Sequence, residues 1–186
     1  MNDILVKKII FFISTILVSN ILYAKNLQYF VNQASYQTLS APYQYYNYQP
    51  PKMMDKAIKE LPSFANVKKC STNYISDAIV IVKPVLNYQA QSTILYGDLH
   101  VKIYQTRSES ETNPDNFIKD MKITHWDVLK FDTVTMDFYI NKIYKTLLEK
   151  MIIEINNLQI NSDFPTNGSY CNLLNTVKES KINLRY

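Results

Sequence analysis

The stretch that decides the fold reads AIVIVKPVLNY from Ala78 to Tyr88, QAQS from Gln89 to Ser92, and TILYGDLHVKIYQT from Thr93 to Thr106. The run Ile79 to Val82 is apolar at every position, which predicts a central strand covered on both faces. In the segment after the turn, one side chain in two is apolar or small, as in a strand with one buried face. One face would hold Leu95, Gly97, Leu99, Val101 and Ile103, and the other Tyr96, Asp98, His100, Lys102 and Tyr104. The two segments therefore predict an antiparallel hairpin with one face on the core and the other in water.

The flanking segments predict the rest of the domain. Leu27 to Val31 is expected to form a short first strand, and Lys119 to Val128 returns as a further strand after a polar link from Arg107 to Asn116. Apolar residues at helical spacing predict a short helix at Pro51 to Leu61 and a long amphipathic one at Met136 to Leu158. The expected fold class is α+β: an antiparallel sheet of about four to five strands, with the long C-terminal helix and the short helix packed on it.

The amino end has the features of a secretory signal peptide. Lys7 and Lys8 precede an apolar stretch from Ile9 to Leu22, and Ala24 stands at the junction with a polar segment. We expect cleavage near Ala24. An uncleaved membrane anchor is the alternative, but the apolar core is shorter than the ~20 residues that cross a bilayer. Residues 25–186 would then form one periplasmic or secreted domain, with a core at about 27–158 and a loop-rich tail at 159–186 that holds at most a short helix near Leu173 to Lys178.

The chain has two cysteines, Cys70 and Cys171. An oxidising destination favours a disulfide between them, and two buried free thiols are the alternative. Neither cysteine lies near the junction at Ala24, so no lipid anchor is expected.

Several kinds of chemistry lack the residues they need. The two glycines, Gly97 and Gly168, cannot make a phosphate-binding loop or a dinucleotide fingerprint, so no cofactor is predicted. The net charge of +4 is mild and its basic residues are scattered, so no nucleic-acid partner is expected. Only His100 and His125 could act as a catalytic histidine, and no nucleophile elbow accompanies them. Asp98 and His100 share a strand face, but no cluster completes a metal site, so neither metal nor catalytic residues are predicted.

Aromatic residues with polar tips offer a binding surface. Its members lie in the tyrosine-rich segment from Tyr36 to Pro51, which is expected to be extended or irregular, and on the outward face of the hairpin and the next strand. They are Tyr43, Tyr45, Tyr46, Tyr48, Tyr96, Tyr104 and Trp126. The alternative is that Tyr43 to Tyr48 only cover the second face of the sheet.

The element order resembles the auxiliary components of envelope ABC-type transporters and related small periplasmic domains of the Tol-system type. It comprises a short strand, a short helix, the strand-entering run SDAIVIVKP from Ser76 to Pro84, a long hairpin, another strand and a C-terminal amphipathic helix. The resemblance covers about Leu27 to Leu158. It implies a non-enzymatic exported accessory protein that docks on an envelope or secretion-system protein through its sheet edge or tyrosine surface. A small-ligand binder for lipid or glycan is the alternative, and a secreted hydrolase is the third.

Overall fold

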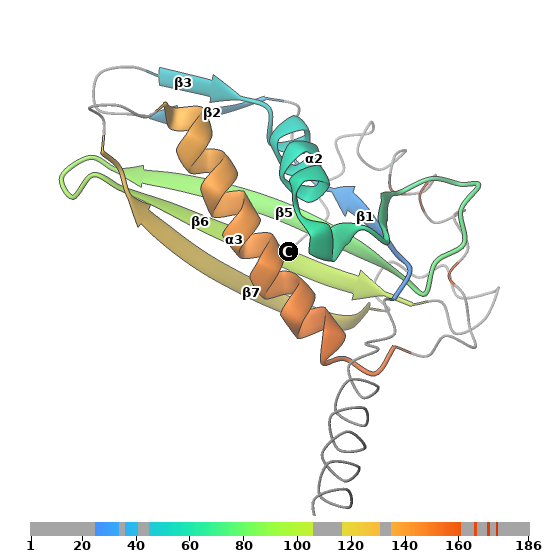
Figure 1. The fold of residues 1–186 in the computed structure, drawn as a ribbon. Coiled ribbons are helices and arrows are strands. Elements are labelled where there is room, and N and C mark those ends of the chain that lie inside the picture. Colours follow the sequence, from blue (N-terminus) through green and yellow to red (C-terminus); the bar gives the residue numbers. More distant parts are fainter. Residues whose placement is uncertain are drawn as a thin grey trace, which may run out of the picture.

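The computed structural model describes residues 25–33, 36–40, 45–105, 117–130, 135–160, 166, 171 and 174. The expected signal peptide, Tyr43, the polar link and the short helix expected near Leu173 to Lys178 lie wholly or mostly outside these residues. The described part is an α+β fold (Figure 1). Its elements are β1 (Leu27–Val31), β2 (Gln37–Ser40), β3 (Tyr45–Tyr48), α2 (Pro50–Glu60), the 3-10 turn η1 (Pro62–Phe64), β4 (Val67–Lys69), β5 (Ala78–Gln89), β6 (Ile94–Tyr104), β7 (Phe117–Val128) and α3 (Met136–Asn156).

Five strands form one sheet in the order β4-β1-β5-β6-β7, and β2 pairs with β3 in a separate hairpin. The predicted hairpin is confirmed, because β5 and β6 are antiparallel with Val82 opposite Val101. The prediction of an antiparallel sheet is wrong for one side: β1 runs parallel to both β4 and β5. Strands joined by a tight turn pair antiparallel, whereas β1 reaches β4 and β5 only after a crossover through the β2–β3 hairpin and α2.

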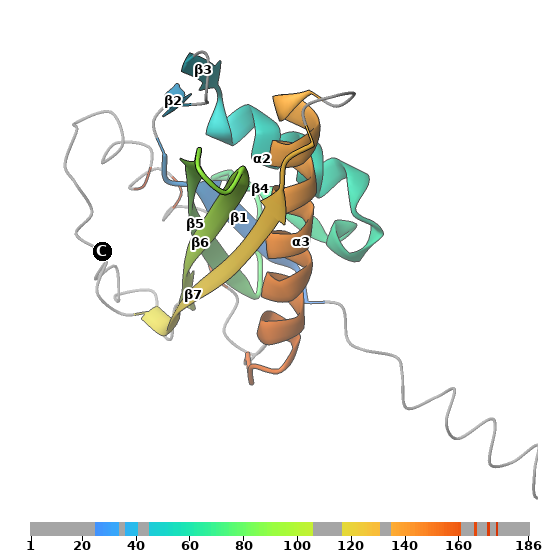
Figure 2. The same ribbon diagram turned by 90° about the vertical axis from the view of Figure 1, so that its left-hand side faces the viewer.

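The helices α2 and α3 cover the same face of the sheet (Figure 2). The long helix α3 contributes Ile140, Ile143, Leu147 and Leu148, all fully buried, to a core that includes Leu95 and Leu99 of β6. Gly97 permits this close approach, because a Cβ at that position would lie 2.4 Å from Cγ2 of Ile143. Among the described helices, none is long and apolar enough to span a membrane.

A second, smaller core lies on the other face of the sheet. It contains Phe30, Ile79, Ile81, Tyr104, Cys171 and Leu174. The run Ile79 to Val82 is therefore covered on both faces, as its sequence predicts. The cover comes from the carboxyl-terminal tail at Cys171 and Leu174, so the alternative that the tyrosine-rich segment covers this face is wrong for its described residues. Tyr48 and Leu39 belong to the helix-side core instead.

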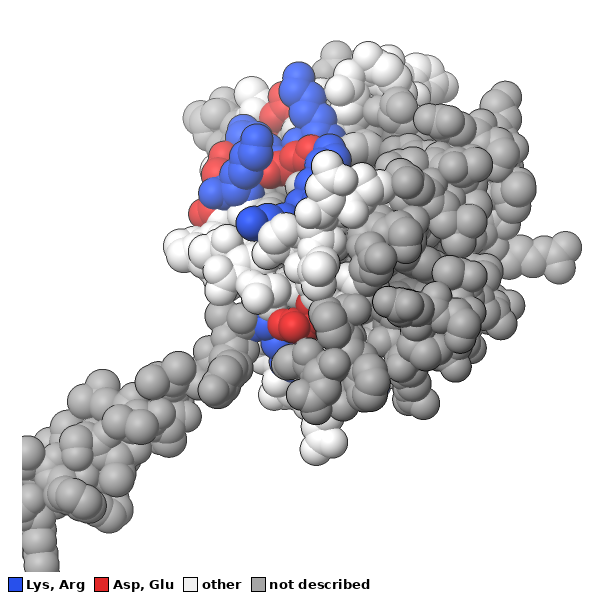
Figure 3. Space-filling view, turned by 90° about the vertical axis from the view of Figure 1, so that its right-hand side faces the viewer, with Lys and Arg blue, Asp and Glu red and all other residues white. Residues whose placement is uncertain are grey.

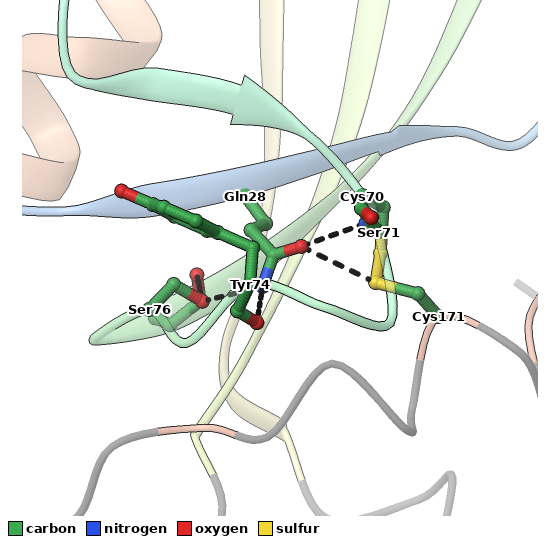
Figure 4. Close-up of a disulfide and its surroundings, with 7 residues drawn as sticks. Gln28, Cys70, Ser71, Tyr74, Ser76 and Cys171 are labelled. Atoms are coloured by element: carbon green, nitrogen blue, oxygen red, sulfur yellow. Dashed lines mark hydrogen bonds between the residues drawn. A yellow bond between two sulfur atoms is a disulfide. The ribbon is translucent and has the colours of Figure 1, made fainter.

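A disulfide between Cys70 and Cys171, whose Cα atoms are 5.6 Å apart, joins the end of β4 to the tail (Figure 4). Beside it lies the fully buried side chain of Gln28. Its amide nitrogen donates to the carbonyl of Tyr74 at 2.9 Å and to Oγ of Ser76 at 3.1 Å, and its Oε1 accepts from the backbone N–H of Ser71 at 2.8 Å. Each of these bonds satisfies a polar group that burial would otherwise penalise, so Gln28 fixes the loop that carries the disulfide.

Lys25, the first described residue, closes the carboxyl end of α3. Its Nζ donates to the carbonyl oxygens of Ile155 at 2.7 Å and Leu158 at 2.5 Å. The last carbonyls of a helix have no partners within the helix and carry partial negative charge, so a lysine ammonium stabilises them. Lys25, just before β1, is thus attached to the carboxyl end of α3.

Candidate functional site

The structure does not bring the aromatic residues predicted from the sequence onto a single surface. Tyr45 is 78% exposed, whereas Tyr48, on the other face of β3, is buried. Tyr96 and Trp126 lie on the outer face of the sheet, away from the helices, and Tyr104, on the same face of β6, is buried beneath the tail. Two separate regions result, which we call the aromatic patch and the groove.

The aromatic patch consists of Ile94, Tyr96, Trp126 and Val128. Tyr96 lies directly opposite Trp126, and Ile94 lies opposite Val128, so the four side chains form a block at one end of β6 and β7. Trp126 is 57% exposed, Val128 42% and Tyr96 38%. The hydroxyl of Tyr96 donates to Oε1 of Gln89 at 3.2 Å, which restrains its ring. The patch therefore presents a pre-oriented aromatic surface.

The patch lies beside an edge of the sheet, because β7 is the last strand in the order. Backbone groups in an antiparallel pair alternate between facing the partner strand and facing away. The N–H of Leu129 donates to Thr93 at 2.7 Å, which points toward β6, while the carbonyl of Thr124 accepts from Nζ of Lys150 at 2.9 Å. The backbone groups of Thr124 therefore face away from β6, and so do those of Trp126, two positions further along the strand.

The groove lies on the helix side, between β3, α2 and the first turn of α3. It has a volume of about 810 Å³. Its lining combines tyrosine rings, amides and charged side chains: Tyr36, Tyr46, Tyr48, Asn47, Gln49, Lys52, Met53, Asp55, Lys56, Lys59, Glu60 and Asp137. The hydroxyl of Tyr46 donates to Oδ1 of Asp137, which ties β3 to α3. Burial, and then this hydrogen bond, raise the pKa of Tyr46, so its hydroxyl keeps its proton.

Each of the three carboxylates in the groove has a partner. Asp55 accepts from the hydroxyl of Tyr29 at 2.7 Å and pairs with Lys69 at 2.8 Å. Glu60 pairs with Lys145 at 2.6 Å and accepts from Asn141 at 3.1 Å. These two contacts, Lys145 first, lower the pKa of Glu60. Figure 3 shows lysine and acidic side chains gathered together at the upper left of the view.

The lysines of α2 differ from Asp55 and Glu60 in having no close ion-pair partner among the described residues. Lys52, Lys56 and Lys59 are exposed and line the groove. In the described part of the chain, no carboxylate lies within ion-pair distance of any of the three. Lys56 interacts with Glu60 only at longer range.

The two histidines lie on opposite faces of the sheet. His100 is opposite Lys122 on the outer face, while His125 is opposite Gly97 on the helix side. Burial, and then the nearby Lys150, lower the pKa of His125. The two imidazoles therefore cannot meet in one centre, and His125 does not approach Asp98 and His100. Within the described ranges, no three His, Cys, Asp or Glu side chains are grouped to hold a metal ion.

Sequence reasoning missed part of each region. Ile94 and Val128 join the aromatic patch only through the strand register. Lys52, Lys56 and Lys59 lie on the solvent face of the amphipathic helix α2, but their position in one groove with Tyr46 depends on the β2–β3 hairpin. The spacing of these lysines, four and then three residues, was the available signal.

The sequence matches no family model and no curated protein. Solved structures with a partly similar fold include a protein from Xanthomonas campestris of the DUF330 family, at 12% identity and a TM-score of 0.43, covering 75% of this chain and 85% of that one. A minor lipoprotein from Acinetobacter baumannii is 12% identical with a TM-score of 0.38, covering 71% of this chain and 91% of that one. At this level of similarity, neither structure assigns a function to the chain.

Proposed function

We propose that this protein is an exported, non-enzymatic accessory protein of the cell envelope that binds a partner protein through the aromatic patch and the adjoining edge of β7. The observation that carries the proposal is the exposed Tyr96–Trp126 pair beside outward-facing backbone groups. Tryptophan and tyrosine are enriched among the residues that dominate binding energy at protein interfaces. The features of a signal peptide and the element order that resembles envelope transporter auxiliary components support the envelope location.

The edge of β7 suggests how the partner binds. A segment of the partner laid beside a sheet edge gains backbone hydrogen bonds, and side-chain contacts then give specificity. Lys119 and Lys122 on β7 are exposed and discourage indiscriminate pairing with other strands. We therefore expect a partner segment with carboxylates opposite these lysines and an apolar pocket for Trp126.

The non-enzymatic part of the proposal rests on the placement of the histidines. His100 and His125 project from opposite faces, so they cannot serve together as base and ligand. Neither histidine lines the groove. A general base needs a reactive group within hydrogen-bond reach at a concave site.

Site-specific photo-crosslinking in the producing cells tests this function. A photoreactive phenylalanine analogue in place of Trp126 should give a discrete adduct with one envelope protein. The matched control is Ile153 on α3, which is 60% exposed against 57% for Trp126 but lies on the helix side of the molecule. The adduct should be absent from position 153 and should weaken when Tyr96→Ser is added.

The purified pair then gives a quantitative check. Removing a central tryptophan from an interface costs about 2 kcal/mol or more, so Trp126→Ala should weaken binding at least about 30-fold. Equal adducts from positions 126 and 153, or no effect of Trp126→Ala on the affinity, would overturn the proposal.

A further inference from the structure

We propose that the groove between β3, α2 and α3 binds an acidic oligosaccharide, a sugar chain that carries carboxylate or sulfate groups. This second site is on the helix side of the molecule and shares no residue with the aromatic patch. It therefore goes beyond the proposed function and does not depend on it.

The charge distribution selects an anionic ligand. Two of the three acids of the groove are paired with lysines within the protein, Asp55 with Lys69 and Glu60 with Lys145. The third, Asp137, accepts a hydrogen bond from the neutral hydroxyl of Tyr46 and keeps its charge. The three lysines that line the same groove have no ion-pair partner among the described residues. In the described lining, three lysines without an ion pair against one carboxylate without an ion pair leave the groove with a net positive charge, which attracts an anion most strongly at low ionic strength.

The positions of the lysines indicate an extended ligand. Lys52, Lys56 and Lys59 are spaced four and three residues apart along α2, so they lie on one face of the helix. At a rise of 1.5 Å per residue, the row is about 10 Å long. A single small anion would engage one ammonium group, whereas a chain with repeated acidic groups can engage all three.

The rest of the lining indicates sugar rather than lipid. Among the described residues that line the groove, Met53 is the only aliphatic side chain apart from the lysine stems, so much of the apolar surface belongs to tyrosine rings, which suit the face of a sugar ring better than an acyl chain. Tyr36 is 66% exposed and offers a ring face, and the ring of Tyr46 is held by its bond to Asp137. Asn47 and Gln49 add amides that both donate and accept hydrogen bonds, as sugar hydroxyls require. The volume of about 810 Å³ is within the range of ligand sites.

Binding to the purified protein tests the inference. Isothermal titration at low salt should use oligogalacturonate, alginate and chondroitin sulfate hexasaccharides, with methyl-esterified oligogalacturonate as the uncharged counterpart. At least one acidic chain should bind at least ten times more tightly than the methyl ester, and its affinity should fall as salt is added. If none of the three binds, or if the methyl ester binds equally well, the inference is wrong.

Variants locate the binding. The triple change Lys52→Gln, Lys56→Gln and Lys59→Gln keeps good helix formers on an exposed face and should reduce affinity at least tenfold. The control Lys119→Gln, Lys122→Gln and Lys130→Gln removes the same charge from exposed positions elsewhere and should leave the affinity within twofold. Tyr36→Ala should also weaken binding, while Trp126→Ala should not change it. Equal losses from the two triple variants would contradict a site in the groove.

Two other polyanions serve as competing probes. Vesicles containing phosphatidylglycerol and a single-stranded DNA 12-mer present phosphates without the sugar arrangement proposed here. If either binds the groove as tightly as the best acidic oligosaccharide, the surface is a general cationic one and the inference fails. Failure here leaves the crosslinking test of the aromatic patch unaffected.

Discussion

Gly97→Ala tests whether the contact between α3 and the sheet is as close as the structure indicates. The new Cβ would lie 2.4 Å from Cγ2 of Ile143, 3.1 Å from Cδ1 of Leu147 and 3.3 Å from Cδ2 of Leu86. Ile143 is fully buried, and its Cγ2 is bonded to the Cβ of a β-branched side chain that has one strongly preferred rotamer in a helix, so it cannot easily turn away. Overpacking of this kind costs about 1–3 kcal/mol, and replacing glycine by alanine recovers about 0.4–1 kcal/mol by restricting the unfolded chain.

We expect a net loss of about 1–2 kcal/mol in the free energy of unfolding. With a urea m-value of about 2 kcal/mol/M, the unfolding midpoint should fall by about 0.5–1 M. Circular dichroism during urea titration of the purified protein measures this, provided that the m-value does not change.

A double-mutant cycle with Ile143→Ala identifies the cause. The single change Ile143→Ala removes Cγ2 and should cost about 2–5 kcal/mol. In that background the methyl group added by Gly97→Ala has room, so its additional cost should disappear and the two changes should be coupled by at least about 1 kcal/mol. The reasoning is refuted if Gly97→Ala leaves the midpoint unchanged or has the same cost in both backgrounds.

Three further predictions concern stability. Thiol labelling of the unreduced, denatured protein should find no free cysteine, and full labelling would contradict the disulfide. The double change Cys70→Ser and Cys171→Ser should lower the free energy of unfolding, measured by urea titration, by about 4 kcal/mol, because the bridge spans 101 positions. Lys25→Met keeps the stem but loses the ammonium at the end of α3, so it should lower the free energy of unfolding by about 1 kcal/mol, and an unchanged midpoint would refute the capping role. The pKa of His125 is lower in the folded protein than in the unfolded chain. The neutral imidazole therefore contributes to the free energy of unfolding above the unfolded-state pKa of about 6.5, and this contribution is lost as the pH falls through the folded-state pKa. The urea midpoint should therefore be lower at pH 5.5 than at pH 7.5, by less in His125→Gln, and an equal drop in the variant would exclude His125 as the cause.

The sequence predicted the elements whose pattern is long and regular. β5, β6 and α3 each carry more than ten residues with a clear period, so their type and the hairpin between β5 and β6 followed directly. β4 has three residues, too few to show a period, and it was missed. The parallel direction of β1 depends on the path of the connection rather than on its own five residues, although their complete burial is typical of parallel strands.

For the two candidate surfaces, too, the sequence predicts some of the residues but not how they come together. Trp126 and Tyr96 could be named from the sequence because they fall on the polar face of alternating strands. Their adjacency requires the exact pairing of β6 with β7, which the sequence does not specify. Tyr104 fits the same pattern as Tyr96 but is buried, because a tail held by a distant cysteine covers that end of the strand.

The interior position of β1, between β4 and β5, affects how the polypeptide matures. Synthesis proceeds from the amino end, so LQYFV emerges before either of its neighbours in the sheet. Asn26, next to this strand, and its partner Asp77 are 51 positions apart. Until β5 has emerged, the nascent strand has apolar side chains and unpaired amides that a chaperone or a protease can recognise. A product that stops short of β5 would therefore be cleared or would aggregate, rather than persist as a smaller folded unit.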